Sequence, residues 1–148
     1  MPISPETRRA FLDTEYRVRL SQGGCAVIRI GEPLPPGLHG CVKDNRTPWG
    51  FITAWNPSAQ QSSRARNREC QRELLAALRE RGARLRPGMG VGANDGGNAW
   101  REPSLFVAGL DFDSMDELAR RFEQTAIVRG LGRGTAELRE PAPEIRSH

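Results

Sequence analysis

The stretch Trp100–Ser104 holds the side chains best suited to acid–base chemistry. Side chains alternate between the two faces of a strand, which puts Trp100, Glu102 and Ser104 on one side. Arg101 and Pro103 then lie on the other side. An indole ring beside a carboxylate removes water from it and raises its pKa toward the range of a general base. Glu102 is therefore the candidate catalytic residue, and the alternative is a structural ion pair with one of the many arginines.

Two asparagines mark a second candidate, at a junction of strand and helix. The strand Trp49–Trp55 must end at Asn56, because Pro57 has no N–H group for the sheet. Asn67 lies on the buried face of the next helix, where an unpaired amide costs about 1–3 kcal/mol. Two interpretations stay open. Either Asn67 ties down the Asn56 turn, or both amides face a ligand at the helix N-terminus, where free N–H groups favour anions.

A third feature is the arginine-rich segment 64–86, which contains eight arginines and three glutamates. Arg64, Arg68 and Arg72 recur at helical spacing and form one stripe. Such a stripe either binds phosphates or is a solvated face. The segment contains no interleaved aromatic residues that could stack on bases, which weakens the case for nucleic acid.

Hydrophobic periodicity and turn residues predict the elements that position these side chains. A short N-terminal helix spans residues 4–13, and a long helix spans 62–81 and ends at Gly82. A further helix begins at the capping box Ser114/Glu117. Residues 31–48 are expected to form a loop, and strands are expected at 15–20, 25–30, 49–55, 83–91, 102–110, 126–129 and 136–139. This order predicts an α+β fold: a mostly antiparallel sheet with two main helices packed on one face, plus the short N-terminal helix.

Length and composition fit one domain and exclude several protein classes. The 148 residues predict a single α+β domain over 1–140 and a loose C-terminal tail over 141–148. Collagen-like, coiled-coil and disulfide-scaffold proteins are excluded by composition. Apolar runs are too short for a membrane helix or a signal peptide, and three unevenly spaced cysteines favour a reducing cytoplasm. No metal site and no cofactor is predicted.

Three motifs in order carry a family resemblance. They are Phe51-Ile-Thr-Ala-Trp-Asn-Pro57 with Asn67, Trp100-x-Glu102-x-Ser104 with Gly109, and Phe122-x-Gln124-x-Ala126-Ile-Val128. From about Tyr16 to Val128 the chain resembles the bacterial family called domain of unknown function 3293. The resemblance implies functional polar positions at Thr53, Asn56, Asn67, Glu102, Ser104 and Gln124, and it implies no reaction.

The leading hypothesis is a cytoplasmic domain that binds a small, anionic ligand in a polar cleft. The Asn56 turn, the long helix and the Trp100–Ser104 strand would form that cleft. The expected ligand-binding residues are Thr53, Asn56, Asn67, Trp100, Ser104, Gln124, Arg64 and Arg101, with an arginine holding the negative charge. The second choice is a nucleic-acid-binding accessory protein that uses the segment 64–86, and the third is a scaffold or oligomer module. Enzymatic activity and oligomeric state stay open, and no membrane partner is expected.

Overall fold

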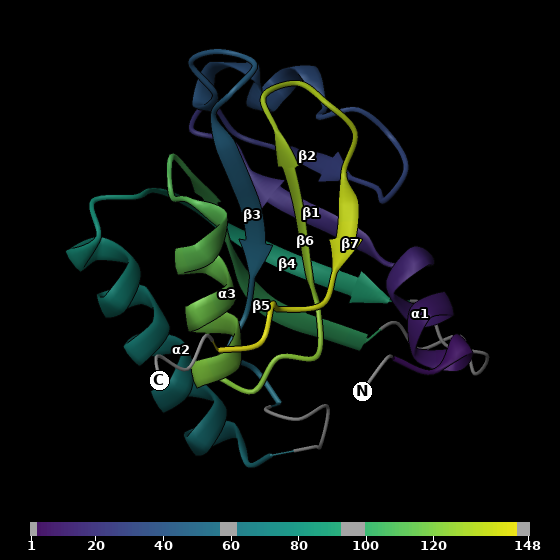
Figure 1. Ribbon diagram of the computed structural model, residues 1–148, viewed down its shortest axis with the longest axis vertical. Coiled ribbons are helices and arrows are strands. Elements are labelled where there is room, and N and C mark those ends of the chain that lie inside the picture. The colour runs from purple at the N-terminus through teal and green to yellow at the C-terminus, as the bar shows by residue number, and fades with distance from the viewer. Residues whose placement is uncertain (1–2, 57–61, 93–99, 145–148) are drawn as a thin grey trace.

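A seven-stranded antiparallel sheet forms the frame of the computed structural model, which describes residues 3–56, 62–92 and 100–144 (Figure 1). The strand order is β2-β1-β4-β5-β3-β6-β7, and every neighbouring pair is antiparallel. The strands are β1 (Glu15–Arg19), β2 (Cys25–Ile28), β3 (Pro48–Ile52), β4 (Arg84–Gly92), β5 (Trp100–Ala108), β6 (Ile127–Leu131) and β7 (Glu137–Arg139).

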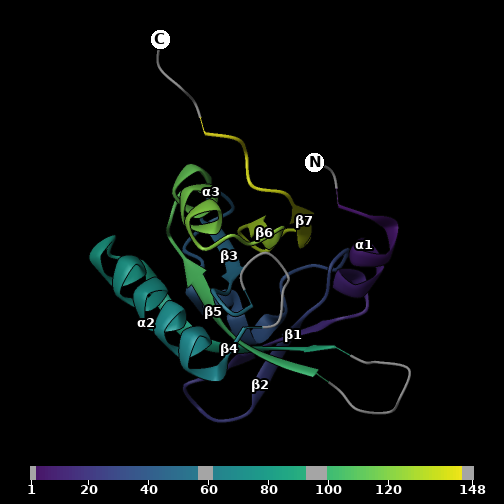
Figure 2. The same ribbon diagram turned by 90° about the horizontal axis from the view of Figure 1, so that it is seen from below.

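Two main helices pack on one face of this sheet, as Figures 1 and 2 show. They are α2 (Arg64–Glu80) and α3 (Phe112–Arg121), whereas α1 (Pro5–Leu12) lies at the other side of the molecule. Apolar side chains of both helices meet one face of β3, β5 and β6, and they include Leu74, Leu78, Met115, Leu118, Ile52, Val107 and Ile127. The predicted α+β architecture is confirmed.

The opposite face of the curled sheet is filled at one end by the segment that follows β2. Residues 31–48, predicted to be a loop, contain the short 3₁₀ helix η1 (Pro36–Cys41), which the sequence analysis missed. Leu34 and Leu38 from this segment pack on Trp49, Phe106 and neighbouring apolar residues. Because proline and glycine dominate the segment, its periodicity is too weak to reveal a helix of six residues.

Helix ends follow the sequence signals with one exception. Ser4 caps α1, and Gly82 follows α2 with a φ of +72°, as expected. Helix α3 begins earlier than predicted, because Asp111 and not Ser114 is its N-cap. The Asp111 carboxylate accepts the Ser114 backbone N–H at 2.7 Å. Aspartate caps as well as serine, so the first suitable residue after the strand starts the helix.

The C-terminal residues run past α3. The guanidinium of Arg120 donates a hydrogen bond to the carbonyl of Ala142. Residues 140–144 have no regular secondary structure. Across the residues described, no helix combines the length and apolar character that crossing a membrane requires.

Candidate functional site

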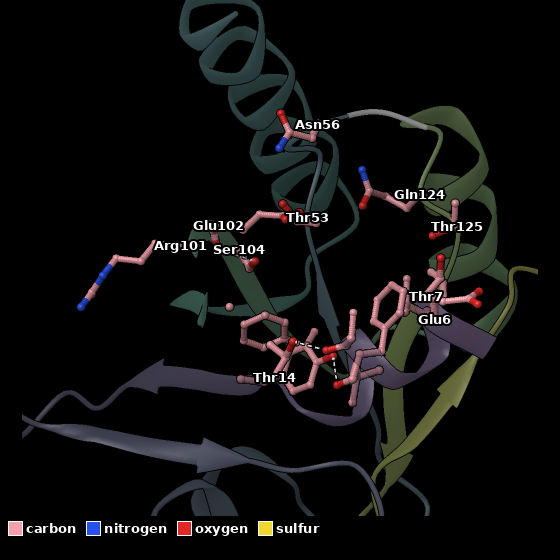
Figure 3. Close-up of a pocket in the computed structure, with 18 residues that line it drawn as sticks. Glu6, Thr7, Thr14, Thr53, Asn56, Arg101, Glu102, Ser104, Gln124 and Thr125 are labelled. Carbon is pink, nitrogen blue, oxygen red and sulfur yellow. Dashed lines mark hydrogen bonds between the residues drawn. The ribbon is translucent and has the colours of Figure 1, made fainter. Parts of the chain in front are cut away.

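A cavity of about 510 Å³ opens on the sheet face opposite α2 and α3, beside α1 (Figure 3). One wall comes from α1 and the segment that leads into β1, and the other walls come from β3, β4, β5 and the start of β6. The lining residues are Glu6, Thr7, Ala10, Phe11, Thr14, Tyr16, Phe51, Thr53, Asn56, Gly90, Arg101, Glu102, Ser104, Gln124, Thr125, Ala126, Ile127 and Val128.

Strand register explains why Glu102 faces open space. In the sheet, Gly90 of β4 pairs with Glu102 on one side and with Tyr16 of β1 on the other. These three residues therefore form one row across the strands, on the same face. Gly90 has no side chain, which leaves a gap in the row between the Tyr16 ring and the Glu102 carboxyl. Gly88 and Gly92 lie on the same face of β4, and at Gly88 the ring of Phe51 takes the space of a side chain, 2.8 Å from where a Cβ would lie.

The Glu102 carboxyl is half-buried, and burial raises its pKa to about 7 from an ordinary value of 4.5. A hydrogen bond with the Thr53 hydroxyl acts in the opposite direction but is the smaller effect. The same hydroxyl lies 2.7 Å from the carbonyl of Pro103, so its single proton serves one of these two acceptors at a time. Near neutral pH, Glu102 therefore exists in both the charged and the neutral form.

Two hydroxyl groups hold α1 against this region. The Tyr16 hydroxyl donates to the carbonyl of Phe11 at 2.8 Å, and the Thr14 hydroxyl donates to the carbonyl of Ala10 at 2.6 Å. Burial raises the pKa of Tyr16, and the nearby negative charge of Glu102 raises it further. Tyr16 is therefore a neutral hydrogen-bonding wall of the cavity at physiological pH.

The asparagine pair closes the turn after β3. The Asn56 backbone N–H donates to Asn67 Oδ1 at 2.8 Å, and Asn67 Nδ2 donates to Asn56 Oδ1 at 2.9 Å. Ser62 N–H donates to the same Asn56 oxygen at 3.1 Å. Asn56 adopts a φ of +48°, a left-handed conformation that asparagine tolerates well. The interpretation of Asn67 as a clamp on the Asn56 turn is confirmed, and Asn67 is not among the residues that line the cavity.

The structure brings most of the predicted site residues together. Thr53, Asn56, Glu102, Ser104 and Gln124 all line the one cavity. The Ser104 hydroxyl donates to the Glu102 carbonyl at 3.0 Å. The Gln124 amide donates to the carbonyls of Phe122 at 3.2 Å and Trp55 at 3.4 Å, and so connects the end of α3 to the end of β3.

The predicted arginines do not supply a positive charge to the cavity. Arg101 belongs to the lining, but its exposed side chain points away from Glu102 (Figure 3). Arg64 is exposed on the first turn of α2 and does not belong to the lining. The side chain of Trp100, the expected stacking wall, lies outside the described part of the structure.

The arginine-rich segment forms a solvated, partly neutralised surface. Arg64, Arg68 and Arg72 are all exposed on α2. Arg72 pairs with Glu69 at 2.9 Å, and Arg81 pairs with Glu117 of α3 at 3.1 Å. These contacts match the interpretation of the stripe as a solvated face, because exposed pairs of this kind hold arginines loosely in water.

Sequence reasoning missed the wall that α1 provides, with Glu6, Thr7 and Phe11. The docking of an eight-residue helix without a buried residue leaves no signal in the sequence. Thr14 could have been predicted as a lining residue, because it lies two residues before Tyr16 and therefore on the same side of the chain. In the same way Phe51 shares a face with Thr53.

Comparison with known proteins identifies the family. The family described as "Protein of unknown function (DUF3293)" matches residues 52–127, slightly more than half of the chain. No curated protein and no solved structure matches the chain significantly. The matched span is shorter than the expected one from about Tyr16 to Val128, but it contains Thr53, Glu102, Ser104 and Gln124. The resemblance inferred from three motifs is thus confirmed, and the chain belongs to the family "Protein of unknown function (DUF3293)".

Proposed function

We propose that this protein binds a small molecule in the cavity beside α1, with Glu102 as its principal polar contact. The proposal rests on a half-buried carboxyl that faces an open cavity, beside the hydroxyl of Thr53. Thr53 is the hydrogen-bond partner of this carboxyl, and none of the ion pairs among the described residues gives it a counterion, so its charge is left for a ligand to match.

The size and the lining of the cavity support a small-molecule site. Its volume of about 510 Å³ falls within the ~300–1,000 Å³ that small-molecule pockets usually occupy. Aromatic and aliphatic residues form much of the lining, including Phe11, Phe51, Ile127 and Val128. A few polar groups converge among them, which is the usual arrangement for orienting a ligand in an apolar site.

The protonation behaviour of Glu102 adds chemistry to this binding role. With a pKa of about 7, the carboxyl can accept or give up a proton near neutral pH. A general acid or base works best when its pKa is close to the working pH. If the bound molecule reacts in the cavity, Glu102 is the group that transfers the proton.

Nothing in the described surface favours the nucleic-acid alternative over this cavity. The arginines of α2 are exposed, two of those in the segment 64–86 pair with glutamates, and aromatic residues do not interleave with them. We keep the reducing cytoplasm as the proposed location, supported by the fact that Cys25, Cys41 and Cys70 are all free.

A fragment screen by two-dimensional ¹⁵N NMR tests the proposal. We expect fragments that bind to shift the backbone signals of Glu102, Ser104 and Gln124. Thr7→Trp, which fills the rim of the cavity from α1, should abolish those shifts. Arg8→Trp is the matched control, because Arg8 is the exposed neighbour outside the lining. Shifts confined to the surface of α2, or equal effects of the two variants, would refute the cavity as the binding site.

A further inference from the structure

We propose that the ligand of this cavity is a small organic cation, a protonated amine or amidinium with an apolar body. Its charged nitrogen would bind the Glu102 carboxylate, and its body would lie against the aromatic side chains. This inference rests on the proposed function of the cavity and adds the chemical class of the ligand.

The charges around the cavity point to a cation. Its charged lining residues are Glu6, Glu102 and Arg101, and the Arg101 side chain points outward. Among the ion pairs formed by the described residues, none includes Glu102 or Glu6. A carboxylate that loses water without gaining a counterion is destabilised, and a cationic ligand supplies that counterion. An anionic ligand would instead have to approach two carboxyl groups.

The aromatic walls favour the same class of ligand. The rings of Tyr16 and Phe51 meet edge to face, with centroids 5.2 Å apart and an angle of 73° between their planes. Both residues, together with Phe11, line the cavity that holds Glu102. The faces of aromatic rings attract cations, most strongly where water is excluded. An amine with an apolar body would thus satisfy the carboxylate and the rings together.

The available donor atoms favour an organic cation over a bare metal ion. Hard metal ions require several oxygen ligands, which proteins usually supply from clustered carboxylates. In the part of the chain that the structure describes, no group of three or more His, Cys, Asp and Glu residues is placed to hold a metal. One carboxyl with the Thr53 hydroxyl beside it matches an ammonium or amidinium head, whose N–H groups need oxygen acceptors.

Binding of a cation must be linked to the protonation of Glu102. The groups that face this carboxyl are the Tyr16 hydroxyl from β1 and the hydroxyl of Thr53, the residue after β3, with the backbone of Gly90 on β4. Glu6 of α1 lines the same cavity, and Arg101 is the charged neighbour on β5. A cation binds only the ionised carboxylate well. Affinity should therefore rise as the pH increases through the pKa of Glu102, and binding below that pKa should release a proton.

Three probes of the same shape and different charge test this inference. Benzylamine, benzyl alcohol and benzoate are titrated into the ¹⁵N-labelled protein at pH 8 and at pH 5. We expect benzylamine to bind in the cavity about tenfold more tightly than either other probe at pH 8. Its affinity should fall about tenfold or more at pH 5. Glu102→Gln should remove the preference, whereas the control Glu80→Gln, at an exposed site on α2, should leave it intact.

The outcomes separate the two proposals. If benzoate or benzyl alcohol binds the cavity as tightly as benzylamine, the cation is ruled out and the small-molecule site remains. If no probe shifts the signals of the cavity at millimolar concentration, while fragments also fail to bind there, both proposals fail. The comparison of pH 8 with pH 5 uses the unmodified protein, so the inference stays testable even if Glu102→Gln does not fold.

Discussion

Asp116 and Glu102 carry carboxyl groups that are both at least partly buried, but their partners in the protein differ. Asp116 on α3 is 4% exposed and lies 3.3 Å from the guanidinium of Arg129 on β6. That guanidinium also covers the ring of Phe112, 4.3 Å from its centroid. Glu102 on β5 is half-buried on the other face of the sheet, and its described partner is the hydroxyl of Thr53.

The two carboxyl groups differ in whether the protein supplies a counterion. On the helix-covered face, apolar side chains fill the space and the charge of Asp116 is matched within the protein. Beside α1, the sheet face is left open, and the charge of Glu102 has no counterion among the described ion pairs. A buried pair keeps its geometry only with both partners present. The pairing of Asp116 indicates a structural role, and the unmatched charge of Glu102 is the reason for the proposed binding role.

The largest effect is expected from Arg129→Met, which removes the cation from the matched carboxyl. Asp116 would then be buried without a partner, and the free energy of unfolding should fall by about 4 kcal/mol. Chemical denaturation at pH 7 measures this change. The double variant Asp116→Asn/Arg129→Met should recover part of the loss, because it removes the unpaired charge. A loss below about 1 kcal/mol would mean that the pair behaves as an exposed one.

Glu102→Gln should instead raise the free energy of unfolding at pH 8. Folded Glu102 has a pKa of about 7 against an ordinary value of 4.5, so the folded state binds a proton more tightly than the unfolded state. Stability contributed by this proton is present below about pH 4.5 and is lost as the pH rises to 7. The neutral amide avoids that loss, so the variant should exceed the unmodified protein by at most about 3 kcal/mol at pH 8.

The same pair of proteins should be nearly equal in stability near pH 4, where Glu102 is mostly protonated in both the folded and the unfolded state. Denaturation curves at both pH values give the difference directly. A variant that is less stable than the unmodified protein at pH 8 would show that Glu102 supports the fold, as Asp116 does.

Asn67→Ala tests whether the hydrogen bonds from Asn67 to the Asn56 turn serve the fold, as Asp116 does, or ligand binding. The substitution removes two hydrogen bonds between Asn67 and Asn56 and leaves polar groups of the turn unpaired. We expect a loss of about 2 kcal/mol in unfolding free energy. Binding of benzylamine, measured below the melting temperature, should change by less than about twofold. A variant of unchanged stability that binds benzylamine more weakly would show that Asn67 contributes to ligand binding.

Thr53→Val should give the smallest change in stability. It removes the hydroxyl that contacts Pro103 and Glu102 and accepts the Trp55 backbone N–H at 3.0 Å, at a cost of about 1 kcal/mol. Because that hydroxyl lowers the pKa of Glu102, its removal should raise the pKa above the present value. Carboxyl NMR signals report the shift. A lowered pKa would show that another group controls the charge of Glu102.

Local sequence patterns were sufficient for the sheet-borne part of this site. Strand alternation placed Glu102 and Ser104 on one face, and the burial of Asn67 implied a partner, which proved to be Asn56. These inferences needed only neighbours in the chain or one adjacent element.

Long-range placement accounts for what the sequence did not reveal. Helix α1 lines the cavity opposite Glu102 and Gln124, residues far away in the sequence, so its place at the site follows only from the folded sheet. Composition suggested an anion site because arginines are abundant. The number of arginines does not determine where their side chains point, and the Arg101 side chain points away from the cavity. Charge at a site depends on where side chains point, which the sequence alone does not give.

A carboxyl NMR titration of Glu102, with and without benzylamine, shows whether this carboxyl is available to a cationic ligand. Glutamate labelled with ¹³C at the side-chain carboxyl, with Glu102→Gln to assign the signal, gives the pKa of this one group. We predict a pKa of about 7 for the free protein and a lower value when benzylamine is bound. A pKa near 4.5 that benzylamine does not move would contradict the assignment of Glu102 as the available carboxyl.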